Sequence, residues 1–370
     1  MTQTDIEYKT LIERILNEGI KKEDRTGTGT LQIFGAMGRY DCKNNRLPLL
    51  TTKRVHFKSV LHELLWFLKG DTNIQYLCQN NVKIWDEWPY NLYIGHCKTI
   101  QEPDLDILVD DPNENCLRPY SIEEFAKRIA NDDQFAKTFG DIGKVYGKQW
   151  VNWECAKPII PINNEKSGNG AATWESINQL QNAINTLNTN PDSRRILVTA
   201  WYPGQVETAC LPPCHYSYQF CSTIMDRRER TEMFIDYCRM DGIDLSTDLD
   251  EQMEFYEYPK RKLSILFNMR SVDVGLGYSF DIASYGVLLA MVAKFTKHVT
   301  REVIISSADT HIYSNHIDAM HEQIKRVGHD IQPWIKIDAT DIKSIFDLKY
   351  ENFQLINYIS DAPIKMKVAV

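Results

Sequence analysis

A cysteine preceded by two prolines and followed by a histidine is the residue best suited to covalent chemistry in this 370-residue chain. It is Cys214 in the segment LPPCH, where the prolines restrict the backbone just before the thiol. A nucleophilic cysteine must be partly thiolate, which requires positive charge nearby. Three short polar segments supply candidate arginines, namely Arg25, Arg194, Arg195 and Arg270. Taken alone, the motif leaves open whether Cys214 is a nucleophile or a buried structural thiol.

A second candidate for chemistry is Glu63, which stands in the middle of the apolar segment VHFKSVLHELLWFLKG. Burial favours the neutral form of a carboxyl and allows it to exchange protons near neutral pH. The alternative is a hydrogen-bonded structural carboxylate.

Composition is that of an ordinary globular protein, with 43% hydrophobic and 25% charged residues and a net charge of −8. The acidic balance argues against duplex nucleic acid as a partner. Nine cysteines without CxxC spacing favour neither a disulfide framework nor a metal site. Neither a membrane-spanning run nor a secretory signal is recognisable, so we expect a cytoplasmic protein.

These residues must be positioned by several helices and strands. Apolar spacing predicts helices at 5–20, ending near Gly19, and at 55–70, 177–190 and 280–296. Branched and aromatic residues predict a turn and strand at 24–35 and strands at 194–202, 216–224 and 261–270. The fold class is therefore α+β, with buried helices packed on strands. Length alone would allow two domains.

Nine sequence segments, found in a fixed order along the chain, support these candidate roles together. They are EDRTGTGTLQIFG, LPLLTTKRVHFKSVLHELLWFLKGDTNI, VKIWDEW, GDIGKVYGKQW, NPDSRRILVTAW, LPPCHYSYQF, RSVDVGLGYSFDIASY, DTHIYSNH and APIKMKVAV. The chain thereby resembles the thymidylate synthase family almost from end to end. The resemblance implies one catalytic domain over residues 1–370, a large mixed sheet with packed helices, and a homodimer formed through that sheet. Insertions at about 91–140 and 222–260 interrupt it, and we expect them to be peripheral or to contact another subunit.

The resemblance also implies roles for individual residues. Cys214 matches the nucleophile that adds to C6 of a pyrimidine, Glu63 a proton shuttle, and Tyr146 the tyrosine associated with removal of the C5 proton. The residues that match the family's nucleotide-binding set are Arg25, Arg194, Arg195, Arg270, Ser271, Asp273, His215, Gln219, His311 and Tyr313. Of these, Arg194 and Arg195 are expected to reach the other subunit's site, and His311 and Tyr313 to hold the sugar hydroxyl. The residues that match the folate side are Trp85, Trp88, Asp273, Gly277, Phe280 and Val370. The implied co-substrate is 5,10-methylenetetrahydrofolate, without a metal.

One departure bears on the substrate. Thymidylate synthases read FNIASY where this chain reads FDIASY, with Asp281 in place of asparagine. In the family this position faces the edge of the base. An amide answers both the N3–H donor and the O4 acceptor of uracil, whereas a carboxylate repels O4 and accepts from the N4 amino group of cytosine. Deoxycytidylate hydroxymethylases carry aspartate here and also have the NMRS segment. Asp281 therefore predicts dCMP, unless it is a neutral variant in a dUMP enzyme.

The product depends on what reduces or hydrates the methylene group at C5. Hydride from the folate gives methyl, and water gives hydroxymethyl. Because Trp85 and the tail MKVAV are retained, we favour methylation of dCMP to 5-methyl-dCMP. Hydroxymethylation of dCMP, thymidylate synthesis from dUMP, and an inactive homologue that binds a nucleotide or mRNA are the alternatives. The favoured activity would supply modified DNA, as in the host cytoplasm during phage growth.

Overall fold

The computed structural model describes residues 1–24, 26–99, 107–111, 116–158 and 172–368. They form two compact units. Unit 1 comprises residues 1–65, 183–197 and 214–370, and unit 2 comprises residues 66–182 and 198–213. Arg25 and Val370 lie outside the described residues, so their predicted contacts stay predictions.

Unit 1 is built on a mixed sheet with the strand order β1-β2-β10-β9-β8. The short strand β7 follows β8 in this order, and its first residue is the last residue of the segment 183–197. The strands are β1 Ile20–Lys22, β2 Thr30–Asp41, β7 Leu197–Thr199, β8 His215–Ile224, β9 Arg261–Asp273 and β10 Val299–Tyr313. β9 and β10 pair in parallel, while β1 with β2, β2 with β10 and β8 with β9 pair antiparallel. The long central strands β9 and β10 carry several of the predicted site residues.

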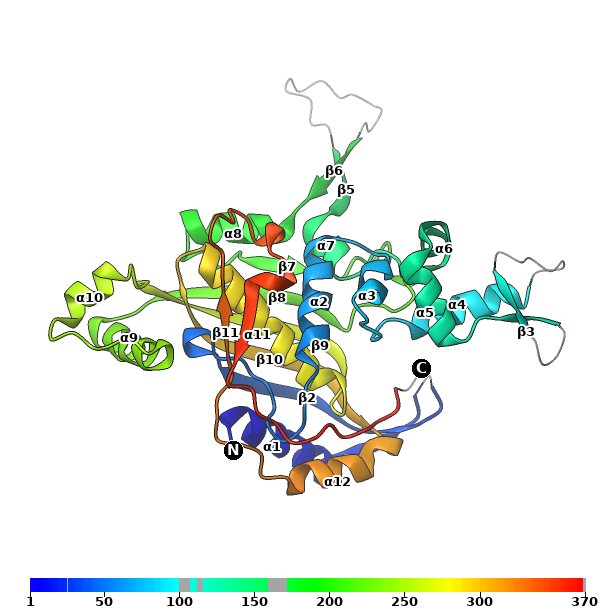
Figure 1. Ribbon diagram of the computed structural model, residues 1–370, viewed down its shortest axis with the longest axis horizontal. Helices are drawn as coiled ribbons and strands as arrows, with labels where there is room; N and C mark the ends of the chain where they lie inside the picture. Colours follow the sequence, from blue (N-terminus) through cyan, green and yellow to red (C-terminus); the bar gives the residue numbers. More distant parts are fainter. Residues whose placement is uncertain (25, 100–106, 112–115, 159–171, 369–370) are drawn as a thin grey trace. The chain divides into compact units, whose positions relative to one another are not determined.

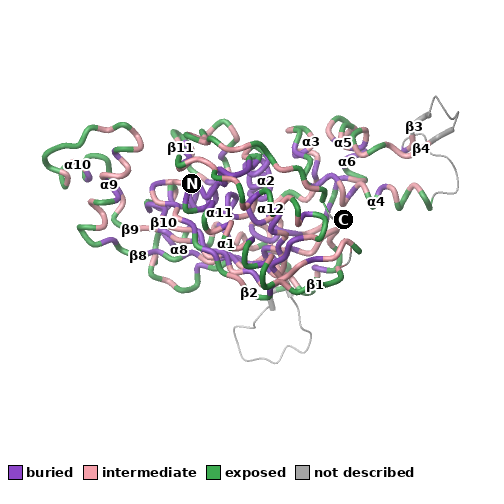
Figure 2. The backbone as a smooth tube through the Cα atoms, turned by 90° about the horizontal axis from the view of Figure 1, so that it is seen from below, coloured by how far each residue is buried: buried purple, intermediate pink, exposed green. Residues whose placement is uncertain are grey.

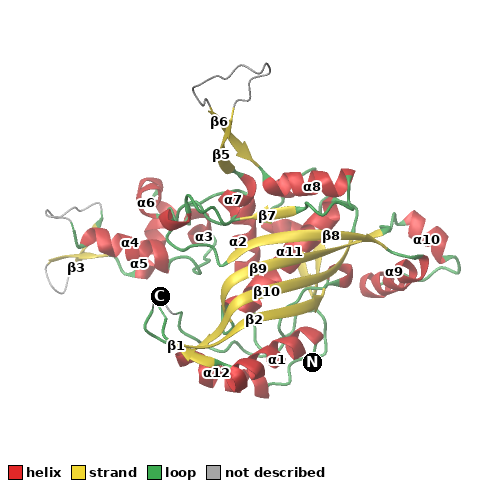
Figure 3. Cartoon of the chain, turned by 180° about the vertical axis from the view of Figure 1, so that it is seen from behind, coloured by secondary structure: helices red, strands yellow, loops and turns green. Residues whose placement is uncertain are grey.

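Helices cover one face of this sheet. Figure 3 shows β2, β10, β9 and β8 in front of α11 (Gly277–Phe295) and α2 (Phe57–Leu68). Every residue of α11 from Ile282 to Ala293 is buried, as expected for a helix that is apolar all round. Figure 2 shows the buried backbone concentrated around these helices. The side chains of Phe34 and Met37 on β2 are 81% and 64% exposed.

The remaining elements of unit 1 surround this core (Figure 1). They are α1 Gln3–Glu18, α9 Arg227–Asp241, α10 Leu249–Phe255, α12 Ile317–Lys325, and the strand pair β11 Trp334–Ile337 and β12 Phe353–Ile356. Short 3-10 turns occur at Lys43–Asn45, Ser314–His316, Ile345–Asp347 and Tyr350–Asn352. Helix α8, Gln179–Thr189, crosses the boundary between the units, as does α2.

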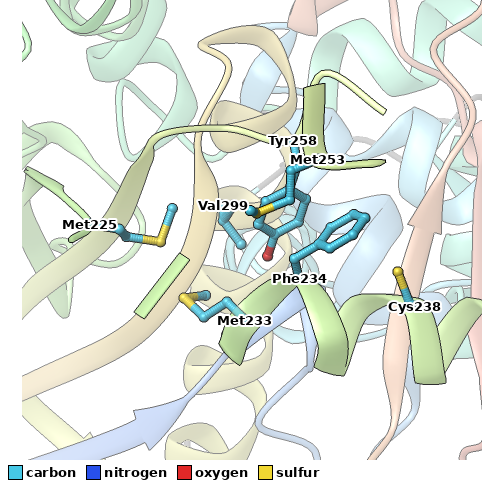
Figure 4. Packing of buried hydrophobic residues seen from close by; sticks show 7 residues of the cluster. All are labelled: Met225, Met233, Phe234, Cys238, Met253, Tyr258 and Val299. Carbon is cyan, nitrogen blue, oxygen red and sulfur yellow. The ribbon is translucent and has the colours of Figure 1, made fainter. Parts of the chain in front are cut away.

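The predicted insertion at 222–260 folds as a small helical module with its own core. Phe234 and Cys238 of α9 pack with Met253 of α10 in a buried cluster (Figure 4). The other members of the cluster are Met225, Met233, Tyr258 and Val299. Because Val299 starts β10, this core is continuous with the central sheet.

Unit 2 contains short helices and two hairpins. They are α3 Gln75–Gln79, α4 Glu87–Cys97, α5 Ile122–Asn131, α6 Asp133–Phe139, α7 Gly147–Val151, the 3-10 turn Val206–Thr208, the hairpin of β3 Leu108–Asp111 with β4 Cys116–Pro119, and the hairpin of β5 Trp153–Pro158 with β6 Ala172–Ile177. The described part of the insertion at 91–140 is held by aromatic packing. Tyr93 contacts the rings of Phe125, Phe135 and Phe139 at centroid distances of 5.2, 5.9 and 5.4 Å.

The mixed α+β class and the central helices agree with the sequence predictions. The helix predicted at 5–20 is α1, which ends before Gly19, and the one predicted at 280–296 is α11. The strand predicted at 194–202 is wrong in length, since only Leu197–Thr199 is extended. Within the described ranges, no helix is long and apolar enough to cross a membrane.

Candidate active site

The thiol of Cys214 lies where the chain enters β8, directly beside β9. The backbone N–H of Arg270 donates to the carbonyl oxygen of Cys214 at 2.9 Å. The Arg270 Nη2 donates toward the Cys214 sulfur at 3.7 Å. The register of β8 on β9 shifts between His215 and Ser217, and this irregularity adjoins the thiol. The arrangement places a permanent positive charge against a half-buried sulfur, which favours thiolate.

The neighbouring His215 is buried and points into the core. Its Nδ1 lies 3.0 Å from the hydroxyl of Tyr285, whose ring stacks on Phe267 at 3.9 Å between centroids. Burial lowers the pKa of His215 to about 3. The imidazole is therefore neutral at physiological pH, and it supports the start of β8 through Tyr285.

Asp281 stands one turn into α11, close to two other carboxyls. Burial raises its pKa well above the ordinary value, and the negative charges of Glu63 on α2 and Asp273 at the end of β9 raise it further. These effects favour the neutral, protonated form of the Asp281 carboxyl over the ionised form. In the neutral form the carboxyl presents one O–H donor and one carbonyl acceptor, whereas the ionised form only accepts.

Strand β10 brings its own polar side chains to the same edge of the sheet. His311 pairs in register with Asp273 of β9, and Asp309 with Ser271. The ring of Tyr313 meets that of His311 edge-on at 5.0 Å. Residues 309, 311 and 313 alternate with the buried Thr310 and Ile312, so they share one face of the strand.

The remaining predicted nucleotide contacts in unit 1 lie on connecting segments and strand β8. The side-chain amide of Gln219 donates to the carbonyl oxygen of Arg194 at 3.2 Å. Arg194 and Arg195 are both exposed, just before β7. Gly277 and Phe280 start α11, and an added Cβ at Gly277 would lie 3.7 Å from the Asp281 carboxyl.

Unit 2 holds the predicted aromatic residues. The ring of Tyr146 packs on Phe67 at 5.1 Å and on Trp85 at 5.8 Å, and Trp88 lies 5.3 Å from Trp85. Tyr146 has a left-handed backbone conformation with φ of 39°, a strained state for a non-glycine residue. Gly147 follows it, where any Cβ would collide with the Phe67 backbone at 2.2 Å. This close approach explains why the tyrosine is followed by glycine.

Sequence reasoning missed Asp309, which contacts His311, and Lys22, which contacts Asp309. Asp309 accepts from Lys22 Nζ at 3.1 Å and pairs with His311 Nδ1 at 2.8 Å. The signal available was the i, i+2 spacing in DTHIY, which places an acid beside the histidine if the segment is a strand. Among the described residues, no cluster of three acid, histidine or cysteine side chains could hold a metal ion.

The mixed sheet, with a thiol and an arginine paired at the edge of its central strands, defines an α+β protein equipped for cysteine chemistry. The family model for thymidylate synthase matches residues 6–370. A thymidylate synthase of Mycoplasma mobile is 38% identical over 364 residues, covering 98% of this chain and 99% of the relative. Another from Oenococcus oeni is 37% identical over 374 residues, covering both chains fully.

The chain therefore belongs to the thymidylate synthase family. It is an enzyme of the kind that methylates C5 of a pyrimidine nucleotide, and the family implies methylenetetrahydrofolate as co-substrate.

Proposed function

We propose that the chain converts dCMP to 5-methyl-dCMP, with Cys214 as the nucleophile that adds to C6 of the base. 5,10-Methylenetetrahydrofolate supplies the one-carbon unit and the hydride when bound. The observation that carries the choice of base is Asp281, an acid at the position where the family has asparagine.

The thiol–arginine pair supports the nucleophilic role. Arg270 contacts Cys214 through both its backbone and its guanidinium, so one residue positions the sulfur and stabilises its negative charge. The same charge suits a nucleotide phosphate, together with Arg25, Arg194, Arg195 and Ser271. His311 and Tyr313 are proposed to hold the sugar.

The raised pKa of Asp281 supports cytosine for a chemical reason. Thiolate addition to C6 drives negative charge toward N3 and the exocyclic group at C4. A carboxylic acid can donate its proton to N3 of cytosine and accept from the N4 amino group with its carbonyl oxygen. An amide can form two similar hydrogen bonds but cannot transfer a proton. The pKa of Asp281, raised by burial and then by Glu63 and Asp273, favours the form of the carboxyl that holds this proton.

Thymidylate synthesis from dUMP is the second candidate, and the comparisons favour it more directly than dCMP. Relatives from Mycoplasma mobile, Mesoplasma florum and Oenococcus oeni all carry the name thymidylate synthase. In its protonated form Asp281 would not repel uracil O4 as an ionised carboxylate does, because its O–H can donate to O4. Discrimination against dUMP then depends on proton transfer to N3, which uracil does not require.

Methyl is proposed over hydroxymethyl because aromatic side chains exclude water. Trp85 is buried and contacts the rings of Tyr146 and Trp88, so these side chains form an apolar wall, which is the proposed folate side of the site. Asp273, Gly277, Phe280 and Val370 are the other proposed folate contacts, and Tyr146 is proposed to assist removal of the C5 proton. Glu63, a buried residue of the apolar helix α2, is the proposed proton shuttle. Retention of Cys214, Glu63, Tyr146 and His311 disfavours an inactive binding homologue.

A homodimer through the open face of the sheet is part of the proposal. Phe34 and Met37 expose large apolar side chains there, and such patches on a folded protein mark contact surfaces. The exposed Arg194 and Arg195 are proposed to reach the partner's nucleotide.

The reaction is tested by incubating the protein with methylenetetrahydrofolate and either dCMP or dUMP, and identifying the products by mass spectrometry. The proposal expects 5-methyl-dCMP and an equal amount of dihydrofolate. Formation of hydroxymethyl-dCMP without dihydrofolate would show that the enzyme hydroxymethylates dCMP instead of methylating it. Product formed from dUMP and not from dCMP would show that it is a thymidylate synthase. Cys214→Ser is the control and should form none of these products.

A further inference from the structure

The two ring nitrogens of His311 differ in their hydrogen bonds. Nδ1 lies 2.8 Å from Oδ1 of Asp309, while Nε2 is buried without a hydrogen-bond partner among the described residues. The residue is only 7% exposed. A buried polar atom without a partner costs free energy, so a ligand group is expected to pair with Nε2.

Asp309 determines whether Nε2 of His311 donates or accepts a hydrogen bond. Although burial works against it, hydrogen bonds from His311 and Lys22 lower the pKa of Asp309, which is therefore ionised at neutral pH. An ionised carboxylate only accepts hydrogen bonds, so Nδ1 of His311 must carry the hydrogen. In the neutral imidazole, Nε2 then has a lone pair and accepts.

Lys22 holds Asp309 in place from the far side of β2. It reaches from β1 to Oδ2 of Asp309 at 3.1 Å, leaving Oδ1 for His311. A further negative charge lies nearby in Asp24, whose carboxylate is bound by the backbone N–H of Thr26 at 2.9 Å and of Gly29 at 2.7 Å. Lys22, Asp309 and His311 thus form a chain with a defined direction of hydrogen bonding.

A second buried polar atom without a partner among the described residues belongs to the residue opposite His311 on the neighbouring strand. Gln32 of β2 is the cross-strand partner of His311, and its side-chain oxygen is also buried without a partner among the described residues. Directly opposite residues in an antiparallel pair place their side chains on the same face. The amide oxygen only accepts hydrogen bonds, as Nε2 does in the tautomer described above, so this face of the strands calls for a hydrogen-bond donor.

We propose that Asp309, held by Lys22, is a positioning residue that fixes Nε2 of His311 as a hydrogen-bond acceptor, so that the enzyme requires a hydroxyl that donates at the 3′ position of its nucleotide. The inference rests on the proposed function, because it takes His311 to face the sugar. It adds that the direction of this hydrogen bond is set by a side chain that does not touch the substrate.

Binding of two analogues of each nucleotide tests the direction of this hydrogen bond. Calorimetry would compare dCMP and dUMP with their 3′-deoxy and 3′-fluoro forms, since fluorine is close to hydroxyl in size but cannot donate. The inference expects both analogues to bind about tenfold more weakly than the parent nucleotide, because an acceptor is left unpaired. A 3′-fluoro form that binds as well as its parent would overturn it.

The role of Asp309 is tested with Asp309→Asn, whose amide can turn its N–H₂ toward Nδ1 and place the ring hydrogen on Nε2. This variant should bind the parent nucleotide several-fold more weakly and bind the 3′-deoxy form unchanged. A purely structural residue would weaken both. The matched control is Glu302→Gln, which removes a similar ion pair between β2 and β10, Arg39 to Glu302 at 3.0 Å, and should change neither affinity.

Nitrogen NMR of labelled histidine gives a readout that needs no substrate. His311 in the unmodified protein should have the hydrogen on Nδ1, and Asp309→Asn should shift it toward Nε2. The opposite tautomer in the unmodified protein would overturn the inference. If the nucleotides bind with the expected 3′ preference but no product forms, the proposed reaction fails while this inference stands. If the nucleotides bind without that preference, only the inference about Asp309 fails. If neither dCMP nor dUMP binds, the proposed function and this inference both fail.

Discussion

The guanidinium of Arg270 lies 3.7 Å from the sulfur of Cys214, and the backbones of the same two residues share a hydrogen bond of 2.9 Å. Strand pairing between β8 and β9 thus fixes the distance between the charge and the thiol. Reactivity of Cys214 depends on a contact that the sheet itself maintains.

Replacing Arg270 by methionine should slow alkylation of Cys214 by iodoacetamide roughly tenfold at neutral pH, because a neighbouring cation favours thiolate. Peptide mass spectrometry would follow each thiol separately. Cys221, an exposed thiol on β8, is an internal control whose rate should not change. Equal rates at Cys214 before and after the substitution would show that Arg270 does not activate it.

His215 should make the folded protein sensitive to acid. Its pKa is lowered to about 3 by burial, so the unfolded chain binds this proton below about pH 6.5 while the folded protein does not. The free energy of unfolding therefore falls as pH decreases from about 6.5 toward 3. His215→Gln should remove about 1.4 kcal/mol of the difference between pH 7.5 and pH 5.5, measured by urea unfolding. An unchanged pH dependence in the variant would contradict the assignment.

The helical module at 222–260 should depend on its buried core. Phe234→Ala should lower the free energy of unfolding by about 3 kcal/mol, because it leaves a cavity in the cluster of Figure 4. Phe255→Ala is the matched control, since Phe255 on α10 is 78% exposed and should change stability by less than about 0.5 kcal/mol. Similar losses in both variants would mean that the module is not packed in this way.

Association through the open sheet face can be tested at Met37. Met37→Asp should produce monomers in analytical ultracentrifugation, since a charge in an apolar interface loses its hydration. Val327→Asp introduces the same charge at another apolar side chain, 73% exposed after α12, and should leave the dimer intact. Dimers that persist in the Met37 variant would place the interface elsewhere.

Much of the fold could be predicted from local patterns. The apolar segment at 280–296 predicts α11 well because its length and uniform hydrophobicity suit only a buried helix. Strand β7 was predicted too long because 194–202 is rich in branched residues, yet only Leu197–Thr199 has a strand partner. Pairing between distant strands decides such boundaries, and local sequence carries little information about it.

The site was predicted mainly through the resemblance, residue by residue. The resemblance could assign Asp281 a position opposite the base, but the rise in its pKa depends on burial and on Glu63 and Asp273, of which Glu63 is distant in the chain. Asp309 was missed because its effect on His311 requires both residues to lie on one face of β10. Side-chain networks of this kind become visible only when the strands are assembled.

The choice of base is the central claim, and the specificity ratio tests it most directly. The rate of dihydrofolate formation would give kcat/KM for dCMP and for dUMP, with the unmodified protein and with Asp281→Asn. We predict that the unmodified protein prefers dCMP by at least about tenfold and that the variant prefers dUMP, because only the acid can protonate N3. Turnover of dUMP by the unmodified protein at a rate equal to or above that of dCMP would contradict the account.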